Sequence, residues 1–177
     1  MIEISINETG LKEITAALKQ LERAGVRGGR IVYEGHARHD NSENTNAEIM
    51  EKLIKRGADF FSLGNDRGNV VQTVADKLTS RLQLEMNRKE GLGKSTGHGI
   101  LIEALMAGGK KLTDEVVRRM NAQETANGSA PSPKNNEEYD RKRQSKYGVP
   151  IGVVGKATAD LLNSFAKGGR WKAKLSK

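Results

Sequence analysis

The chain has 177 residues, the size of about one domain, with 36% hydrophobic and 4% aromatic residues and a net charge of +8. It contains no cysteine, which excludes disulfide bonds and thiolate chemistry. No apolar run approaches the roughly 20 residues that a membrane-spanning helix needs, and the N-terminus lacks the pattern of a signal peptide. We therefore expect one small aliphatic core, in the cytosol or in a particle assembled there.

The first 25 residues predict a strand followed by a helix. Isoleucine alternates with polar residues over 2–6, which is the period of a half-buried strand, and its shortness indicates the edge of a sheet. Over 10–25 the apolar residues take helical spacing, which predicts an amphipathic helix. Its apolar face consists of Leu11, Ile14, Leu18 and Leu21.

A second strand is predicted over 30–34, after which the periodicity is lost. Histidine and aspartate are common ligands of transition metals, and His36, His39 and Asp40 could together occupy one face of such an ion. No fourth ligand accompanies them, so we favour a polar loop over a metal site.

A short helix is predicted next, with its N-cap at Thr45 or Asn46 and its end at Gly57. Phe60 and Phe61 follow it and are two of the three phenylalanines in the chain. We interpret them as core residues in preference to a separate hydrophobic anchor.

The segment from Val70 to Met120 predicts an antiparallel pair of long helices, interrupted near Gly91, as the scaffold of the fold. Gly108 and Gly109 fall inside the second helix, where each glycine costs about 1 kcal/mol relative to alanine. We therefore expect a kink, a break or the close approach of another backbone at this point.

Gly93, Lys94 and Ser95 match the end of a phosphate-binding P-loop. That loop also needs a glycine five residues before its Gly-Lys pair and a buried strand leading into it. Arg88 occupies the glycine position, and the preceding residues continue an amphipathic helix. A glycine-rich hairpin between two helices is therefore favoured over a nucleotide site.

The last third of the chain alternates between loops and charged segments. Residues 122–136 have the composition of an extended loop. The charged run 137–146 fits either a solvated helix or an interaction arm. A brief strand is expected over 150–155, and a short helix over 157–165.

Basic charge is concentrated at the C-terminal end. Residues 134–177 hold eleven Lys and Arg against four Asp and Glu, which accounts for +7 of the net charge of +8. Such a concentration fits a polyanion or an acidic protein surface, or else a solvated tail. Trp171 lies among these cations and either contacts a base or a partner, or folds back onto its own domain.

The sequence has no cysteine that could act as a nucleophile and no His-Glu-x-x-His motif. A series of short motifs stands out instead, in a fixed order over the last third of the chain. It runs through Gln123, the Asn-Gly-Ser-Ala of 127–130, Tyr139 with the basic run 141–143, Gly148 and Pro150, and finally Gly155 with the Asp-Leu-Leu-Asn-Ser-Phe of 160–165. In this order the segment resembles the tail-completion, neck and virion-morphogenesis proteins of tailed bacteriophages.

The resemblance implies a structural virion protein that is not an enzyme and carries no cofactor. Such a protein forms a homo-oligomeric ring, commonly of six or twelve copies, that completes the tail or joins it to the head-side connector. Its partners would be copies of itself and neighbouring neck, connector or tail proteins, with DNA in the channel as a further candidate and no membrane. It would be assembled in the host cytoplasm and reside in the virion.

Together these observations predict the α+β class, with an antiparallel long-helix pair packed with a small β-sheet, an extended loop and a C-terminal arm. Residues 1–121 would form the core, and residues 122–177 would complete the same domain. The alternative function is that of a small basic nucleic-acid-binding protein, through 141–146 and 170–177.

The expected subunit or partner contacts are Gln123, Ser129, Pro131, Pro133, Tyr139, Leu162, Phe165 and Trp171. The expected basic surface consists of Arg141, Lys142, Arg143, Lys146, Arg170, Lys172 and Lys174.

Overall fold

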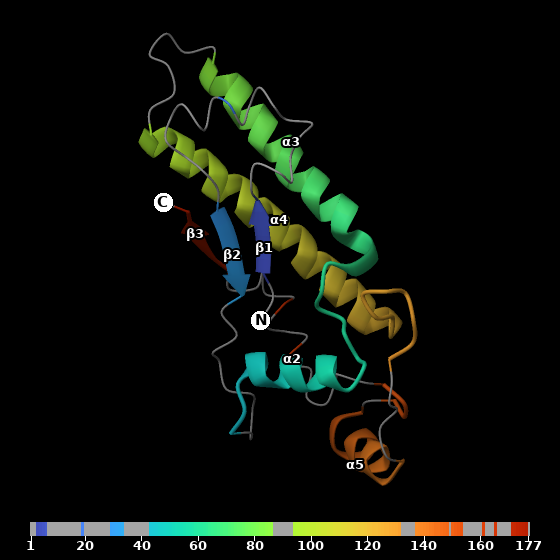
Figure 1. The fold of residues 1–177 in the computed structure, drawn as a ribbon. Helices are drawn as coiled ribbons and strands as arrows, with labels where there is room; N and C mark the ends of the chain where they lie inside the picture. The colour runs from blue at the N-terminus through green and yellow to red at the C-terminus, as the bar shows by residue number, and fades with distance from the viewer. Residues whose placement is uncertain are drawn as a thin grey trace. The chain divides into compact units, whose positions relative to one another are not determined.

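The fold belongs to the predicted α+β class, with long helices and one three-stranded sheet in a computed structural model of the chain (Figure 1). The structure describes residues 3–6, 19, 29–33, 43–86, 94–131, 137–148, 150–153, 161, 165 and 171–176. The chain divides into two compact units. Unit 1 comprises Met1–Ile2, Glu34–Asp66 and Leu112–Arg170, and unit 2 comprises Glu3–Tyr33, Arg67–Lys111 and Trp171–Lys177.

Unit 2 contains the sheet. Its strands are β1 (Glu3–Ile6), β2 (Gly29–Tyr33) and β3 (Trp171–Leu175), in the antiparallel order β1-β2-β3 (Figure 1). The first two predicted strands are confirmed, and β1 lies at an edge as expected. The prediction did not include β3, which lies within the expected C-terminal arm. Its alternation of apolar and basic residues is the period of a strand.

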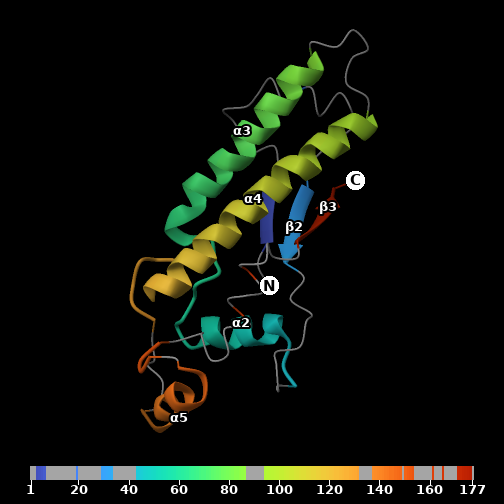
Figure 2. The ribbon, with the colours of Figure 1, turned by 180° about the vertical axis from the view of Figure 1, so that it is seen from behind.

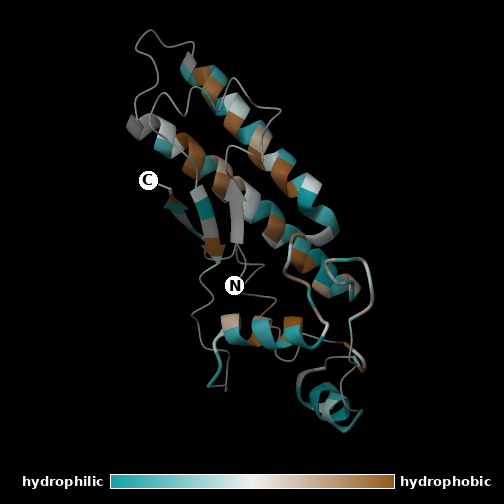
Figure 3. Cartoon of the chain, in the orientation of Figure 1, coloured by the Kyte–Doolittle hydropathy of each residue, from teal (hydrophilic) through white to brown (hydrophobic). Residues whose placement is uncertain are grey.

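The long helices are α3 (Arg67–Met86) and α4 (Lys94–Ala122), and they run antiparallel as predicted (Figure 2). In unit 2 their apolar side chains are buried at helical spacing, which removes them from water and stabilises the pair. Hydrophobic and hydrophilic residues accordingly alternate along both helices (Figure 3). The buried set includes Val70, Val74, Leu78 and Leu82 of α3, and Leu101, Ala104 and Leu105 of α4.

At Gly108 the second helix continues without a break, so the expected break is wrong. A Cβ added at Gly108 would lie 2.4 Å from Cγ2 of Val74. The close neighbour is thus a side chain of α3 and not another backbone. A Cβ at Gly29 of β2 would similarly lie 3.0 Å from Cδ1 of Leu105, so one face of the sheet packs on α4.

Two glycines of α4 provide a matched test of this packing. Gly108→Ala is expected to lower the free energy of unfolding by about 1–3 kcal/mol, because the new methyl group overpacks against Val74. Gly99→Ala, where no atom lies within 4 Å of the added Cβ, is expected to raise it by up to about 1 kcal/mol. Urea denaturation of both variants measures the difference. Equal stability of the two would show that α3 and α4 are not in close contact at Gly108.

Unit 1 begins its described part with α2 (Asn46–Lys55). Thr45 is its N-cap: the Thr45 hydroxyl accepts a hydrogen bond from the Glu48 amide at 3.3 Å, and the Glu48 carboxylate accepts one from the Thr45 amide at 2.6 Å. The backbone bond to Thr45 is the largest cause of a lowered pKa of Glu48. The helix ends close to Gly57, as predicted, and Gly57 takes the left-handed conformation with a φ of 80°.

Phe60 and Phe61 lie in the core of unit 1, as the sequence indicated. Both are fully buried, and Phe61 stacks on Phe165 with ring centroids 5.7 Å apart. The 3-10 helix η2 (Gly64–Asp66) follows them, and α5 (Glu137–Tyr147) lies further along the same unit. The highly charged run is therefore a helix, and it is hydrophilic along most of its length (Figure 3).

The strand predicted over 150–155 is wrong for its described part. Residues 150–153 form a turn, in which Gly152 takes a φ of 82° and Val153 N donates to Pro150 O at 3.4 Å. The two glycines in this short segment favour a turn over a strand, because a strand interior leaves them without packing side chains.

Several predictions fall outside the described residues. They are the helix over 10–25 except for the helical Lys19, the helix over 157–165 except for the helical Leu161 and Phe165, the candidate metal ligands His36, His39 and Asp40, the glycine-rich segment before Lys94, and the site residues Pro133, Leu162 and Arg170. Among the helices that the structure describes, none is both long and apolar enough to cross a membrane.

Candidate functional site

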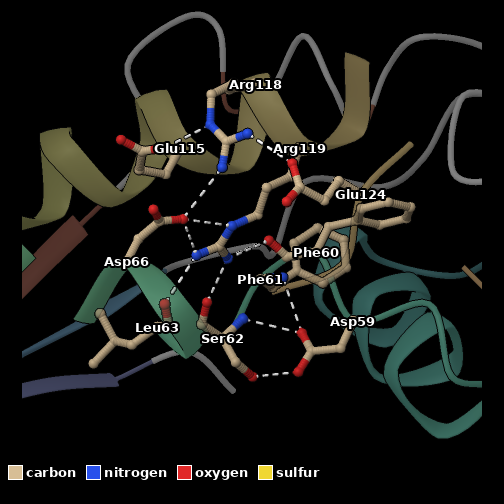
Figure 4. A network of polar contacts seen from close by, with 10 residues as sticks. All are labelled: Asp59, Phe60, Phe61, Ser62, Leu63, Asp66, Glu115, Arg118, Arg119 and Glu124. Atoms are coloured by element: carbon tan, nitrogen blue, oxygen red, sulfur yellow. Dashed lines mark hydrogen bonds and ion pairs between the residues drawn. The ribbon is translucent and has the colours of Figure 1, made fainter. Parts of the chain in front are cut away.

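A buried arginine, Arg119, joins the end of α4 to the segment 59–66 in unit 1 (Figure 4). Its side chain is 1% exposed, and all five guanidinium N–H groups are used. Nε and Nη2 donate to Oδ2 of Asp66, at 2.9 and 2.5 Å. The other bonds go to the carbonyl oxygens of Phe60, Ser62 and Leu63, at 2.5 to 3.0 Å. Arg119 therefore holds in place a segment that has no regular secondary structure before η2.

The neighbouring Arg118 lies on the surface beside this network and is 49% exposed. It pairs with Glu115 and Glu124 at 2.8 Å each, and with Asp66 at 3.5 Å. These hydrogen bonds, with that to Glu115 the largest cause, raise the pKa of Arg118 above its usual value. Asp66 thus links a buried cation to an exposed one (Figure 4).

The segment 123–131, which carries the first motifs of the resemblance, is docked onto the same part of unit 1. Ala126 N donates to Asp59 O at 2.6 Å, and Asn65 N donates to Ala126 O at 2.8 Å. The segment leaves α4 at Gln123 with a φ of 54°, and the Gln123 amide donates to Met120 O at 2.7 Å. The described part of the predicted loop is therefore hydrogen-bonded to the rest of unit 1, and its tip over 127–130 is exposed.

On α5 a buried ion pair holds the turn over 150–153. Nη1 of Arg143 donates to Oδ1 of Asp140 at 2.8 Å and to Val153 O at 2.7 Å. Gly152 N donates to Oδ2 of Asp140 at 2.7 Å, and the Arg143 guanidinium lies 5.3 Å from the centre of the Tyr139 ring. Since Arg143 is 4% exposed, its assignment to a basic surface is corrected: it connects α5 to the turn.

The other predicted basic residues of α5 are exposed but lie beside acids of the same helix. Arg141 and Lys142 pair with Glu137 and Glu138 at i,i+4 spacing, at 3.6 and 2.8 Å. Lys146 is also exposed, and Lys172 and Lys174 are exposed on β3. The structure therefore separates the predicted basic surface into a helical part in unit 1 and a strand part in unit 2.

The predicted contact residues also fall into two groups. Ser129 and Tyr139 are exposed, and Gln123 and Pro131 are half-buried. Phe165 and Trp171 are buried within the chain itself. Trp171 packs edge-on against Tyr33 with ring centroids 5.5 Å apart, so of the two alternatives it folds back onto its own domain. Phe165 and Trp171 are core residues here, which corrects their assignment as contact surfaces.

The sequence did not single out Arg119 and Asp66, which form an extensive polar network in unit 1. One signal was present: Arg119 lies between the apolar Val116 and Met120, both fully buried. A cation in an apolar stripe needs a partner, since an unpaired buried charge is costly.

The contacts described above fix the positions of the loops of unit 1 and leave parts of them exposed to solvent. Within the ranges that the structure describes, no group of three or more His, Asp or Glu side chains is placed to hold a metal ion. Comparisons of the chain with protein-family models, curated proteins and solved structures find no match.

Proposed function

We propose that this chain is a structural protein of a tailed-phage particle. In this proposal it forms a ring of six or twelve copies at the neck or the tail end, where it completes the tail and joins it to the head connector. The observation that carries the proposal is the ordered series of motifs from Gln123 to Phe165, which resembles the tail-completion and neck proteins. The role is one of subunit contact and not of catalysis.

The contacts of unit 1 support this role. The first motifs of the resemblance lie in a segment with defined contacts: Gln123 makes the turn out of α4, and the segment 123–131 is hydrogen-bonded to 59–66. Their exposed parts, the loop tip over 127–130 and the outer side of α5, are polar surfaces carried by rigid elements. Rigid display of a surface lowers the entropy that is lost on assembly.

Closure of a ring requires heterologous contacts, in which one patch of a copy meets a different patch on the next copy. The loop tip over 127–130 is our candidate for one of these patches. The exposed side of α5, with Tyr139 half-exposed, is a second surface of unit 1 and a candidate for contact with a neighbouring neck or tail protein.

The test measures the mass of the purified protein by light scattering, with negative-stain imaging, for the wild type and two variants. Asn127→Trp adds bulk at the exposed loop tip, and Gln83→Trp adds the same bulk at an exposed site on α3. We expect the wild type to form rings of six or twelve times 19.3 kDa, alone or on phage particles. Asn127→Trp should lower the ring fraction, and Gln83→Trp should leave it unchanged.

A wild-type protein that stays monomeric or dimeric both alone and with phage particles would contradict the ring. Equal loss of rings in the two variants would remove the loop tip as the contact.

The second candidate function is nucleic-acid binding, from a different class. It is favoured by the excess of basic residues at the C-terminal end, of which Arg141, Lys142, Lys146, Lys172 and Lys174 are exposed. A protein that remains monomeric and changes mass only when DNA is added would support it.

A further inference from the structure

Arg143 of α5 is a buried cation whose hydrogen-bonding groups are only partly satisfied. Its side chain is 4% exposed, and Nη1 donates to Oδ1 of Asp140 and to Val153 O. The other two nitrogen atoms, Nε and Nη2, are also buried, and within the part of the chain that the structure describes they have no hydrogen-bond partner. Three of the five N–H groups of this guanidinium therefore lack an acceptor.

Arg119 shows how unit 1 satisfies the same group at another position. Its Nε and Nη2 both donate to Oδ2 of Asp66. These two nitrogen atoms form the edge of the guanidinium that matches a planar carboxylate. At Arg143 the carboxylate of Asp140 bonds to Nη1 and to Gly152 N instead, so the edge formed by Nε and Nη2 is left without an acceptor.

An open edge of this kind is unfavourable in the isolated chain. A buried donor without an acceptor destabilises the folded state, and the penalty is larger for a charged group. An acceptor supplied by another molecule would remove this penalty and add a charge-assisted hydrogen bond. Arg143 therefore indicates a site for a ligand that accepts hydrogen bonds.

The charge of α5 favours an acceptor with a single negative charge. The helix holds four basic and three acidic residues, which gives it a net charge of +1. One carboxylate or one phosphodiester group would make the complex neutral. A neutral acceptor would leave the positive charge uncompensated.

The surroundings of Arg143 favour a protein as the source of this group. Five large hydrophobic side chains are exposed among the described residues, and two of them belong to α5 and the turn over 150–153. They are Tyr139, which is 49% exposed, and Ile151, which is 55% exposed. Tyrosine and arginine are enriched at the centres of protein interfaces. Contacts to DNA phosphates depend instead on polar and cationic side chains, so a carboxylate fits this surface better than a phosphodiester.

Access to the open edge requires a neighbouring side chain to move, because Nε and Nη2 are buried. Tyr139 is a neighbour that is able to do so. The centre of its ring lies 5.3 Å from the guanidinium carbon of Arg143, and the ring is half-exposed. Rotation of this side chain therefore costs little buried area and leaves the core of unit 1 unchanged.

From these contacts we propose that α5 and the turn over 150–153 bind an acidic side chain of a partner protein. Its carboxylate accepts hydrogen bonds from Nε and Nη2 of Arg143, and apolar residues beside it contact Tyr139 and Ile151. The inference deepens the contact proposed above for the exposed side of α5, and it rests on the proposed function for the identity of the partner as a neighbouring neck or tail protein.

The test measures binding of two labelled, capped peptides to the full chain by fluorescence anisotropy. One peptide has the sequence Gly-Leu-Asp-Leu-Gly, and in the other asparagine replaces aspartate, which removes the charge and keeps the shape. The wild type should bind the aspartate peptide about tenfold or more tightly than the asparagine peptide, because hydrogen bonds between charged groups are the stronger ones.

Two lysine variants locate the site. Arg143→Lys keeps the positive charge but lacks the edge formed by Nε and Nη2, and Arg141→Lys makes the same change at an exposed position of α5. Arg143→Lys should lose the preference for the aspartate peptide, and Arg141→Lys should keep it. Circular dichroism shows whether both variants are folded.

A second measurement uses the wild type and does not depend on how a variant folds. In nitrogen NMR spectra of the arginine side chains, the Nε–H signal of Arg143 should shift when the aspartate peptide is added. The signal of Arg119, whose Nε already donates to Asp66, should stay unchanged.

Equal binding of the two peptides would overturn the proposal, as would an Arg143 signal that does not move at the highest soluble concentration of the aspartate peptide. A signal that moves with inorganic phosphate or a DNA duplex and not with the peptide would overturn it as well. Rings without peptide binding would overturn this inference alone, whereas peptide binding by a permanent monomer would overturn the ring alone.

Discussion

Arg119→Met is expected to lower the free energy of unfolding by about 3–5 kcal/mol, because removal of one partner of a buried ion pair leaves the rest uncompensated. Methionine also has an unbranched side chain, but it donates no hydrogen bond. Asp66 and the carbonyl oxygens of Phe60, Ser62 and Leu63 therefore lose the hydrogen bonds that Arg119 donates to them. Urea denaturation monitored by circular dichroism measures the loss.

The adjacent arginine is the matched control for this prediction. Arg118→Met removes three ion pairs, yet the side chain is 49% exposed, and exposed pairs contribute about 0–1 kcal/mol. Two neighbouring residues of one type should thus differ several-fold in effect. If the two variants lose the same stability, the buried network does not anchor the segment 59–66 to α4.

Gly64→Ala is expected to cost about 2–5 kcal/mol, from two sources. Gly64 has a φ of 49°, where a residue with a Cβ is strained by about 1–2 kcal/mol. The added Cβ would also lie 2.0 Å from Ala126 O, a backbone atom that accepts the hydrogen bond of Asn65 N. Relief of this clash means moving the loop, which adds about 1–3 kcal/mol.

Gly148→Ala isolates the strain from the clash, because Gly148 has a φ of 67° and no atom within 4 Å of an added Cβ. It is expected to cost about 1–2 kcal/mol. Hydrogen exchange at Asn65 and Ala126 should become faster in Gly64→Ala and stay unchanged in Gly148→Ala. If Gly64→Ala leaves exchange at both amides unchanged, the loop 123–131 is not docked on 59–66.

Both predictions bear on the proposed assembly. The loop tip over 127–130 belongs to the segment 123–131, which is hydrogen-bonded to the segment 59–66 that Arg119 holds in place. If this tip contacts a neighbouring copy, Gly64→Ala should also lower the ring fraction at protein concentrations where the chain is still folded. Loss of rings without loss of fold would then arise from a displaced loop and not from unfolding.

Local patterns were sufficient for most of the regular elements. Period-two alternation identified β1 and β2, the cap at Thr45 and the glycine at Gly57 bounded α2, and apolar spacing identified α3 and α4. Each of these signals depends on residues within a few positions of one another, where backbone geometry sets the period. Where two local signals competed, as in the glycine-containing segment over 150–153, the pattern favoured the wrong element.

The candidate sites depended on contacts between distant residues. Arg118 and Arg119 are the same residue type in adjacent positions, and only the packing of α4 decides that Arg119 is buried against Asp66. Arg143 is likewise not part of the exposed basic surface, because Asp140 and the turn over 150–153 enclose its side chain. Exposure of a charge is a property of its surroundings, which a linear pattern does not contain.

The sequence alone determined the composition, the helical and strand periods and the concentration of positive charge at one end. These properties depend on single residues or on residues that are neighbours along the chain. The tertiary structure decided three further features: the pairing of β3 with β2, the docking of the segment 123–131, and the division of the exposed basic residues between α5 and β3. The physical reason is that hydrogen bonds and charge proximity between residues many positions apart depend on how the chain closes on itself.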